Sequence, residues 1–498
     1  MNVSIVLKCL LTSITVSLSI FLSGQVTFFF AQEMVDDFDP NITHLDGDLF
    51  IGSSFGPTAI TDLSNLSNLT SVSGSVNIRN NEFLTNLSGL DNLRTIGGDL
   101  AIERNWKISN LDGLAALESI GGCLKINDND LLINLFFSNL TSVFESIAIT
   151  GNQILADLDG LSNVTSIGVN IFISNNNEIS DISSLFSQTE LFGNLEIIEN
   201  NSLVTIDLKN IRSIAGDLVI EANNGLTNLD GLDGFNEVNG ALKIKNNNSL
   251  TSIDGLSDLH SINGDLRIMN NNNLTNLNGL TGLSATGATI FIDNNDALNN
   301  LDGMLGISSV EGSLLFYLNG SLENLNGLNG ISSIGKDLTF ISNAKLSNID
   351  GLSTVLSVGE NLTIIDNENL TDCCGVRHLI DNPSSVGFSF FISNNPSECS
   401  SQEEILEVNC SVSTSDVQEL QWRINPNVVM AGSQVKVESD ELMHDVTIDL
   451  INSNGNIIYR TSNIDSIIDI PNDTPSGTYF LRIHTDGIVS TERIVVID

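Results

Sequence analysis

The chain repeats one pattern of hydrophobic and polar positions along most of its length. In each copy an apolar residue follows a turn, Ile usually stands two positions later, and Asn stands five positions later. The internal spacings are 23 or 24 residues, and only the two end spacings stretch, to 27 and 28. This fixed period predicts a solenoid whose end coils act as caps. The copies begin at Leu49, Val76, Leu100, Leu124, Ile147, Ile171, Leu195, Leu218, Leu242, Leu266, Ile290, Leu314, Leu338, Leu362 and Phe390.

The alternation within each copy predicts a short strand with one face inward. Ile stands two positions after the start in thirteen of the fifteen copies, with Phe316 and Phe340 as the exceptions. Further apolar residues follow three apart, as in Leu274 and Leu277, but frequent Gly and Asn leave no room for a helix of useful length. We therefore expect an all-β fold, a parallel solenoid of about 15 coils made of short strands and tight corners. With strands ~4.8 Å apart, the rod would be on the order of 70 Å long.

Asparagine occupies the same corner of nearly every coil. Ser54 replaces it in the first copy only. An amide both donates and accepts, so stacked copies can satisfy one another along the solenoid axis. The predicted ladder consists of Asn81, Asn105, Asn129, Asn152, Asn176, Asn200, Asn223, Asn247, Asn271, Asn295, Asn319, Asn343, Asn367 and Asn395.

The residues one and three positions after each start point outward and vary between copies. Two groups among them are candidates for binding. The first is a basic island with Met beside it, and the second is an apolar patch. Without a binding role, the island would balance the charge of nearby acids such as Glu221, and the patch would pack on the C-terminal module. The candidate binding face comprises Lys243, Lys245, Arg267, Met269, Leu315, Tyr317, Ile341 and Ile365.

Copies such as LTNLDGLDGFNEVNGALKIKNN and LTSIDGLSDLHSINGDLRIMNN resemble the repeat of receptor L domains. These are the right-handed β-helical, leucine-rich-repeat-like modules of receptor ectodomains, and tandem versions occur in secreted proteins of Bacteroidetes-type bacteria. The resemblance therefore implies a parallel right-handed β-helix or leucine-rich-repeat-like solenoid. The resemblance spans roughly residues 44 to 410. It implies binding or adhesion, and it transfers no active-site motif.

Four cysteines cluster near the end of the repeats, Cys373, Cys374, Cys399 and Cys410. In an exported chain they predict two disulfides that staple a C-terminal cap beginning near residue 371. Three pairings are open, and we expect the two adjacent cysteines to bond outward. Cys123 is then left over as a buried or partly buried thiol. The segment CCGVRHLIDNPSSVGFSFFISNNPSECS resembles the cap of the bacterial arrays.

Residues 424–498 contain alternating strands with turns at Asn454-Gly455 and 475–477, which predict a small antiparallel β-sandwich after a polar linker over 411–423. The sequences PSGTYFLRI and STERIVVID look like those of the type A sorting domain of the type IX secretion system, with Gly477, Tyr479 and Arg493 as matching residues. The start, residues 424 to 427, departs from the family's pattern. The resemblance implies contact with that machinery, passage across the outer membrane, and release or surface attachment.

The N-terminus, residues 1–32, has one Lys and then a largely apolar, hydroxyl-dotted run ending at Ala31, which predicts a secretory signal peptide cut near Ala31 or Gln32. An uncleaved anchor is the alternative. The repeats would then occupy 33–410. The expected location is extracellular or at the outer cell surface, with no transmembrane helix in the mature chain.

Charge and scattered functional groups narrow the function further. Nineteen basic and 61 acidic residues give a net charge of −42, which argues against nucleic-acid partners. No catalytic set is recognisable, because the histidines are scattered, and we expect no metal or cofactor. The segments VDDFDP and NDND carry spaced oxygens that suit calcium only weakly, since they lack the Gly and Glu of an EF-hand loop.

Three functions from different classes remain. The favoured one is a non-enzymatic recognition or adhesion protein that binds a glycan or protein through the solenoid face, with binding lost when Lys243, Lys245 and Arg267 become Glu. The alternatives are a polysaccharide-active β-helix enzyme and a purely structural surface rod.

Overall fold

The structure is a computed structural model of the chain. It describes residues 26–185, 189–208, 210–408, 410, 422–425, 428–439, 447–452, 457–461, 467–472, 474–485 and 488–497. The chain divides into two compact units, Met1–Val408 and Asn409–Asp498. Each is described by itself.

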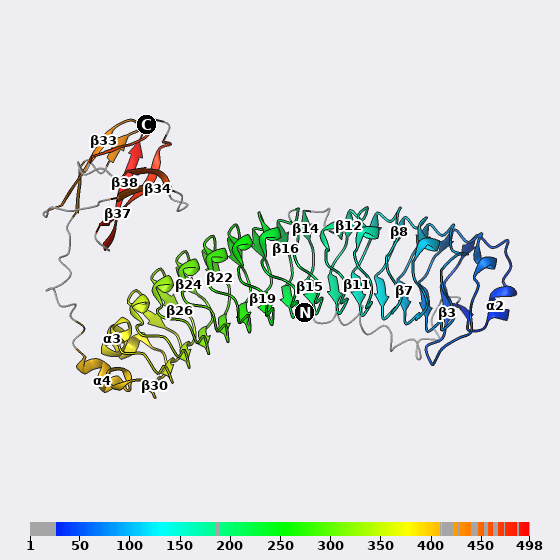
Figure 1. Cartoon of the computed structure of the whole chain (residues 1–498), viewed down its shortest axis with the longest axis horizontal. Helices are drawn as coiled ribbons and strands as arrows, with labels where there is room; N and C mark the ends of the chain where they lie inside the picture. The colour runs from blue at the N-terminus through cyan, green and yellow to red at the C-terminus, as the bar shows by residue number, and fades with distance from the viewer. Residues whose placement is uncertain are drawn as a thin grey trace. The chain divides into compact units, whose positions relative to one another are not determined.

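The first unit is a β-solenoid whose coils each contribute one strand to a 16-stranded parallel sheet, the long sheet. Every predicted copy supplies one such strand. In Figure 1 the unit bends so that the long sheet lies on its inner, concave side. The strands in spatial order are β1 (Val26–Phe29), β3 (Asp48–Gly52), β5 (Val76–Arg79), β7 (Leu100–Glu103), β9 (Leu124–Asn127), β11 (Ile147–Thr150), β13 (Ile171–Ser174), β15 (Leu195–Ile198), β17 (Leu218–Glu221), β19 (Leu242–Lys245), β21 (Leu266–Met269), β23 (Ile290–Asp293), β25 (Leu314–Tyr317), β27 (Leu338–Ile341), β29 (Leu362–Ile365) and β30 (Phe390–Ser393).

Two-residue strands on the other side of the coils form two further parallel sheets, of six and eight strands. The six are β2 (His44–Leu45), β4 (Ser71–Val72), β6 (Thr95–Ile96), β8 (Ser119–Ile120), β10 (Ser142–Val143) and β12 (Ser166–Ile167). The eight are β14 (Glu190–Leu191), β16 (Ser213–Ile214), β18 (Glu237–Val238), β20 (Ser261–Ile262), β22 (Ala285–Thr286), β24 (Ser309–Val310), β26 (Ser333–Ile334) and β28 (Ser357–Val358).

Most coils also make a single 3₁₀ turn, where the sequence had indicated only corners. These turns are η1 (Ser64–Leu66), η2 (Asp112–Leu114), η3 (Asp159–Leu161), η4 (Ser183–Leu185), η5 (Asp230–Leu232), η6 (Asp254–Leu256), η7 (Asn278–Leu280), η8 (Asp302–Met304), η9 (Asn326–Leu328) and η10 (Asp350–Leu352). Glycine is needed in many of them because adjacent coils touch there: a Cβ on Gly303 would lie 1.7 Å from the Leu277 carbonyl oxygen. The apolar spacing of three therefore reflects one 3₁₀ turn.

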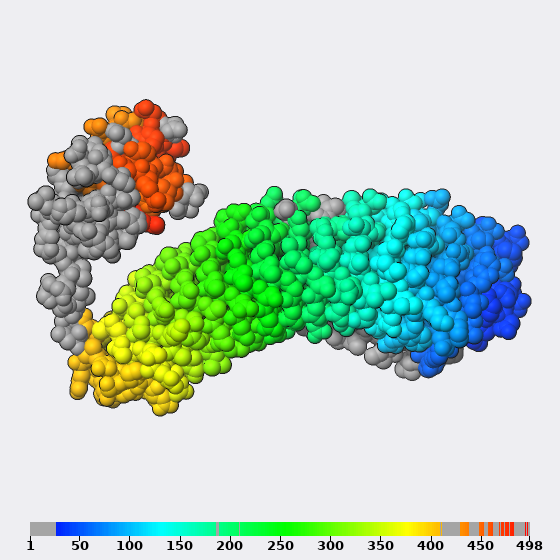
Figure 2. All heavy atoms as spheres, viewed as in Figure 1, coloured from blue at the N-terminus to red at the C-terminus, as the bar shows by residue number. Residues whose placement is uncertain are grey.

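The core is a continuous aliphatic column inside the coils. The Ile of each long strand from β3 to β23, and that of β29, is fully buried, and Phe316 and Phe340, which replace it in two neighbouring coils, stack with ring centroids 5.2 Å apart. Two Phe residues in successive coils therefore keep the column filled without disturbing the period. The space-filling view shows the coils packed into one closed body (Figure 2).

The C-terminal cap contains two helices, α3 (Cys374–Asp381) and α4 (Gln402–Glu407), together with η11 (Pro383–Ser385) and η12 (Ser397–Cys399). The all-β architecture is confirmed, and these short helices are local additions at the cap, where the longer spacing of 28 residues gives α3 room to form. Cys373 and Cys399 form a disulfide with a Cα–Cα distance of 5.8 Å, and Cys374 and Cys410 are disulfide-bonded as well.

The expectation of a leftover thiol at Cys123 is wrong in this structure, where the residue is disulfide-bonded. That expectation rested on removing Cys9 with the signal peptide, which leaves an odd number. The structure is that of the whole chain, which has six cysteines.

The N-terminal end of the long sheet lies inside the range predicted as signal peptide. The four residues of β1 pair with β3, and the buried Phe29 ring meets the Phe38 ring edge-on at 5.5 Å. A short helix, α2 (Gln32–Asp36), follows. Cleavage near Ala31 would remove β1 and leave β3 as the edge strand.

The second unit contains two sheets, one of three strands and one of five. The first is β31 (Trp422–Asn425), β33 (Gln434–Ser439) and β36 (Ile467–Asp469); the second is β32 (Val428–Met430), β38 (Ile488–Ile497), β37 (Gly477–Thr485), β34 (Thr447–Asn452) and β35 (Ile457–Thr461). Neighbouring strands pair antiparallel except β32 and β38. The first strand begins at Trp422, two residues inside the predicted linker, and the Asn454-Gly455 turn lies outside the described residues.

Candidate binding surface

The asparagines at the coil corner form a buried, continuous hydrogen-bonded ladder. The fully buried Asn271 donates from Nδ2 to the Ile244 carbonyl at 2.9 Å, and its Oδ1 accepts from the backbone N–H of Asn247 at 3.1 Å. The same contacts recur from Asn81 to Asn367, with Asn395 receiving the last of them. The ladder residues are therefore structural and face away from any ligand.

The residue before each ladder asparagine adopts a left-handed backbone, with φ of 56° at Asn270. Asn tolerates this region better than most residues. At three successive coils these half-buried positions form a second amide row, in which Asn270 donates to Asn246 and Asn294 donates to Asn270, both at 2.8 Å. Sequence analysis missed this row, and the signal that could have found it is the run of consecutive asparagines.

The basic island is ion-paired along its length. Lys243 Nζ lies 2.7 Å from Asp217 Oδ2, and Lys245 Nζ lies 2.6 Å from Glu221 Oε2 on the neighbouring strand. Arg267 Nη2 lies 2.6 Å from Asp265 Oδ2. These three bases thus offer little unbalanced charge to an anionic ligand.

The apolar patch forms a half-buried row along the concave side. Tyr317, Ile341 and Ile365 occupy the last position of three adjacent strands and are register partners in sequence. Leu315 lies beside them, and the Phe291 ring lies 5.4 Å from that of Tyr317. We call Phe291, Leu315, Tyr317, Ile341 and Ile365 the apolar row. Met269 lies at the same strand position as Tyr317, two coils earlier.

Ionisable groups near the row are partly withdrawn from water. Burial raises the pKa of the Asp293 carboxyl and, despite a hydrogen bond from Thr339, the pKa of Tyr317. Burial also acts against ionisation of Asp265, but the hydrogen bonds and charge of Arg267 outweigh it and lower the pKa of that carboxyl. Perturbed groups that gather on one surface mark a candidate functional site.

Glu196 on β15 is a further group of this kind, which the sequence did not single out. Burial raises its pKa, against a hydrogen bond from Asn194 and the charge of Lys243, with Asp217 and Glu221 adding to the rise. A carboxyl whose pKa is raised by burial is a candidate for a general acid. Glu196 is thus the residue to test for the enzyme alternative.

At the N-terminal end of the same face, Arg79 and Lys125 are buried, although they point outward from the sheet. Arg79 lies over the Phe50 ring at 5.2 Å, and its Nη2 lies 3.4 Å from Glu103 Oε2. Lys125 Nζ lies 2.8 Å from Asp99 Oδ2. These bases are also paired with acids, so they repeat the pattern of the basic island.

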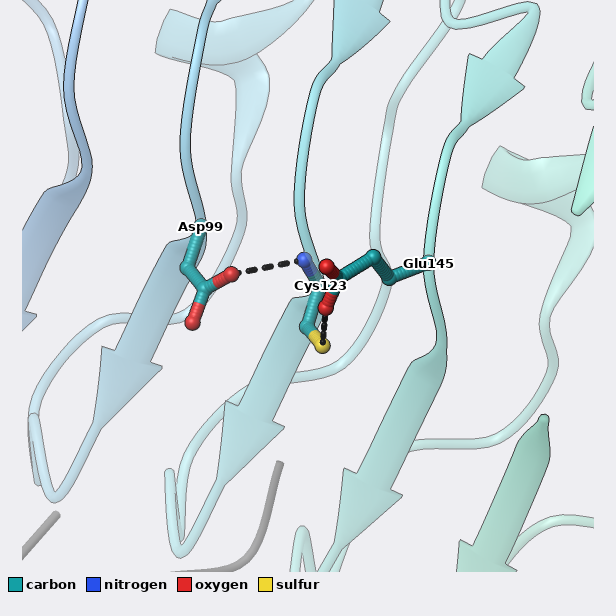
Figure 3. Close-up of side chains that lie close together, drawn as sticks. All are labelled: Asp99, Cys123 and Glu145. Atoms are coloured by element: carbon teal, nitrogen blue, oxygen red, sulfur yellow. Dashed lines mark hydrogen bonds between the residues drawn. The ribbon is translucent and has the colours of Figure 1, made fainter. Parts of the chain in front are cut away.

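Asp99, Cys123 and Glu145 approach one another at the turns before three successive strands (Figure 3). The Cys123 backbone N–H donates to Asp99 Oδ1 at 2.8 Å, and its sulfur lies 3.4 Å from Glu145 Oε2. The sulfur belongs to a disulfide and the other Asp99 oxygen lies against Lys125. This trio therefore fits a soft divalent metal poorly.

The two segments considered for calcium have their oxygens engaged. In NDND, Asn129 belongs to the buried ladder and Asp128 lies 3.6 Å from Arg104. In VDDFDP, Asp39 accepts from the backbone and side chain of Asn41, which lowers the pKa of the Asp39 carboxyl. Neither segment converges into a cluster of carboxylates among the described residues.

Comparison with known families accounts for both units. A family model described as Receptor L domain matches residues 41–112 and 210–306, and a model described as Secretion system C-terminal sorting domain matches residues 425–497. The chain therefore contains receptor L-domain repeats and, at its C-terminal end, a type IX secretion sorting domain. No curated protein matches it. The receptor L-domain coils between and beyond the matched segments have the same strand register, so one architecture spans the whole first unit.

The sorting domain supports secretion to the cell surface or the extracellular space, and it implies contact with the secretion machinery. Within it, β37 begins at Gly477, and the Tyr479 hydroxyl donates to the Pro475 carbonyl at 2.8 Å. Arg493 lies on β38 opposite Phe480. Receptor L domains are non-enzymatic binding repeats, which suggests a binding role for the solenoid. Within the described residues, no helix has the length and apolar character needed to cross a bilayer.

Proposed function

We propose that this receptor L-domain protein is a secreted or surface-attached recognition protein that binds a protein partner through its apolar row. The sorting domain directs export and attachment, and the solenoid presents its concave sheet. The observation that carries the proposal is the apolar row itself, because five large apolar side chains point away from the core in adjacent strands. Clusters of this kind on a soluble protein mark interaction surfaces.

A protein partner suits this surface better than an anionic glycan does. Burying aliphatic side chains and a tyrosine contributes roughly 25 cal/mol per Å² of apolar area. Negatively charged glycans would instead meet bases already paired with Asp217, Glu221 and Asp265. Tyr317 combines an apolar ring with a polar tip, which is typical of residues that dominate binding energy.

The test is an array of surface proteins and glycans probed with the full chain and its variants. Ile341→Glu places a charge in the middle of the row and should weaken partner binding at least tenfold. The matched control is Leu305→Glu, since Leu305 is an apolar residue that is 54% exposed and follows η8, away from the long sheet. Equal loss in both variants, or none in either, would contradict the assignment of the apolar row.

The enzyme alternative has its own readout. Turnover of a polysaccharide panel by the full chain that disappears in Glu196→Gln would replace the recognition proposal, because Glu196 is the desolvated carboxyl of the concave face. Under the recognition proposal the chain turns over none of the panel, and Glu196→Gln binds the protein partner as the unmodified chain does.

A further inference from the structure

A hollow lies over the six-stranded sheet of short strands, outside the apolar row. Its volume is about 450 Å³, within the range of small-ligand sites. It is lined by residues of the first five coils, from His44 in the first to Phe144 in the fifth.

The floor is made of small polar side chains in strict register. Ser71, Thr95 and Ser119 are partners on the adjacent strands β4, β6 and β8. From β2, which carries His44, to β10, which precedes Phe144, there are four strand spacings, or about 19 Å. The hollow is therefore an elongated trough with hydroxyl groups along its floor.

One end of the trough is closed by an aromatic side chain. Phe144 follows β10 and is 66% exposed, although a phenyl ring in water is unfavourable. The corresponding positions of the preceding two coils are Gly97 and Gly121, whose Cβ positions would lie 2.1 and 2.2 Å from the carbonyl oxygens of the coil before. The surface at this position is therefore formed by backbone where Gly is required, and the Phe144 side chain projects above it as a wall at one end of the trough.

The other end carries polar groups from the first coil. The Thr70 hydroxyl donates its only hydrogen to the Thr43 carbonyl at 2.8 Å. In its contact with His44 Nδ1, at 3.0 Å, the hydroxyl oxygen is therefore the acceptor. His44 Nε2 is then the acceptor nitrogen of the neutral ring. Asp46, which is exposed, adds a carboxylate at the same end.

From this arrangement we propose that the trough binds a neutral, linear oligosaccharide, an activity beyond the protein recognition proposed above. Sugar rings present an apolar C–H face that stacks on an aromatic ring, and hydroxyl groups that pair with Ser, Thr, His and Asp. Phe144 supplies the stacking wall. The floor hydroxyls, His44 Nε2 and Asp46 supply the polar contacts.

Other ligand classes fit this trough less well. A peptide strand would need a free sheet edge, and among the strands that line the trough only the two-residue β2, at one end, has one; β4, β6 and β8 are each paired on both sides. An anion would face Asp46 in a chain with a net charge of −42. Arg94, which precedes Thr95 in the sequence, has its Nη1 2.7 Å from Glu118 Oε1 and is engaged there.

The test uses the full chain and isothermal titration with linear, neutral tetra- to hexasaccharides of glucose, mannose and xylose. At least one of them should bind. Phe144→Ala and Thr95→Trp should each weaken binding about tenfold or more, the first by removing the wall and the second by filling the floor. Phe192→Ala is the control for Phe144→Ala, because Phe192 is also 66% exposed and occupies the same coil position outside the hollow. Ser309→Trp is the control for Thr95→Trp, because Ser309 is the equivalent residue of a coil outside the hollow. Both controls should bind as the unmodified chain does.

Several results would overturn the inference. These are no binding of any neutral oligosaccharide, equal binding by all four variants, or a preference for sulfated or uronic-acid chains. Loss of saccharide binding in Ile341→Glu, with Phe144→Ala unaffected, would move the saccharide site to the concave face. The outcome for the trough is separate from that for the apolar row, since protein partner binding depends on Ile341 and not on Phe144.

Discussion

The asparagine ladder makes a sharp prediction at Asn271. Replacing this residue with Ala removes an acceptor from the backbone N–H of Asn247 and a donor from the Ile244 carbonyl. Both groups lie on buried residues, so water does not replace the lost partner without opening the coil. Asn272→Ala is the control, because that neighbour is exposed.

The magnitude follows from the two groups left without a partner. Each unsatisfied buried donor or acceptor costs about 1–3 kcal/mol, so Asn271→Ala should lower the free energy of unfolding by roughly 2–6 kcal/mol. For a cooperative unit of about 380 residues, ~4 kcal/mol corresponds to a fall of about 5 °C in the melting temperature. Asn272→Ala should change the stability by less than about 0.5 kcal/mol.

The assay combines thermal melts followed by circular dichroism with hydrogen exchange. Repeat proteins are stabilised by contacts between neighbouring coils, so the loss of exchange protection should centre on the strands β19, β21 and β23. If Asn271→Ala and Asn272→Ala melt at the same temperature with the same exchange pattern, the ladder contributes nothing measurable, and the reasoning from buried amides is refuted.

Three further predictions concern single positions. Asp293→Asn should raise the melting temperature at pH 7 but not at pH 3. Burial raises the pKa of the Asp293 carboxyl from its ordinary 3.8, so native stability falls as the pH rises from that value through the raised pKa. Thermal melts from pH 3 to 7 check this, with Asp296→Asn at an exposed carboxyl as the control. Removing the disulfide with Cys373→Ala and Cys399→Ala should cost about 3 kcal/mol in urea unfolding, since the cross-link spans 26 positions. Gly303→Ala should lower stability by about 1–3 kcal/mol or more through overpacking, whereas Gly56→Ala, with no atom within 4 Å, should not.

The sequence predicted the solenoid well because its inward positions obey one repeated constraint. Each Ile two positions after a copy start lies in the same column as its equivalents, and no coil can change it without a gap in the core. The start of every copy coincides with a strand of the long sheet, apart from the one-residue difference at Asp48. The cap helices were missed because they fall where the period ends, so no repeat constrains them.

The candidate site was harder to predict because outward residues are defined by their neighbours in space. Lys243 and Lys245 form an isolated pair of bases in the sequence, and their acidic partners are about one coil earlier in the chain. The desolvation of Glu196 and Asp293 also depends on the packing of several coils. Phe144 could have been singled out, since it is a large apolar residue at a coil position where the preceding coils carry Gly.

Ion pairs and apolar columns behave differently on a parallel sheet of this kind. Equivalent residues of adjacent coils lie about 4.8 Å apart, so a base readily meets an acid of the coil before, as Lys125 and Lys243 both do with an Asp one period earlier. Such a pair is largely satisfied within the protein, and a ligand that displaced it would have to compensate for the lost contact. Packing does not bury the apolar row in the same way, because Tyr317, Ile341 and Ile365 each keep part of their apolar surface in contact with water. These exposed apolar side chains are the reason we propose the apolar row as the binding surface of the concave face.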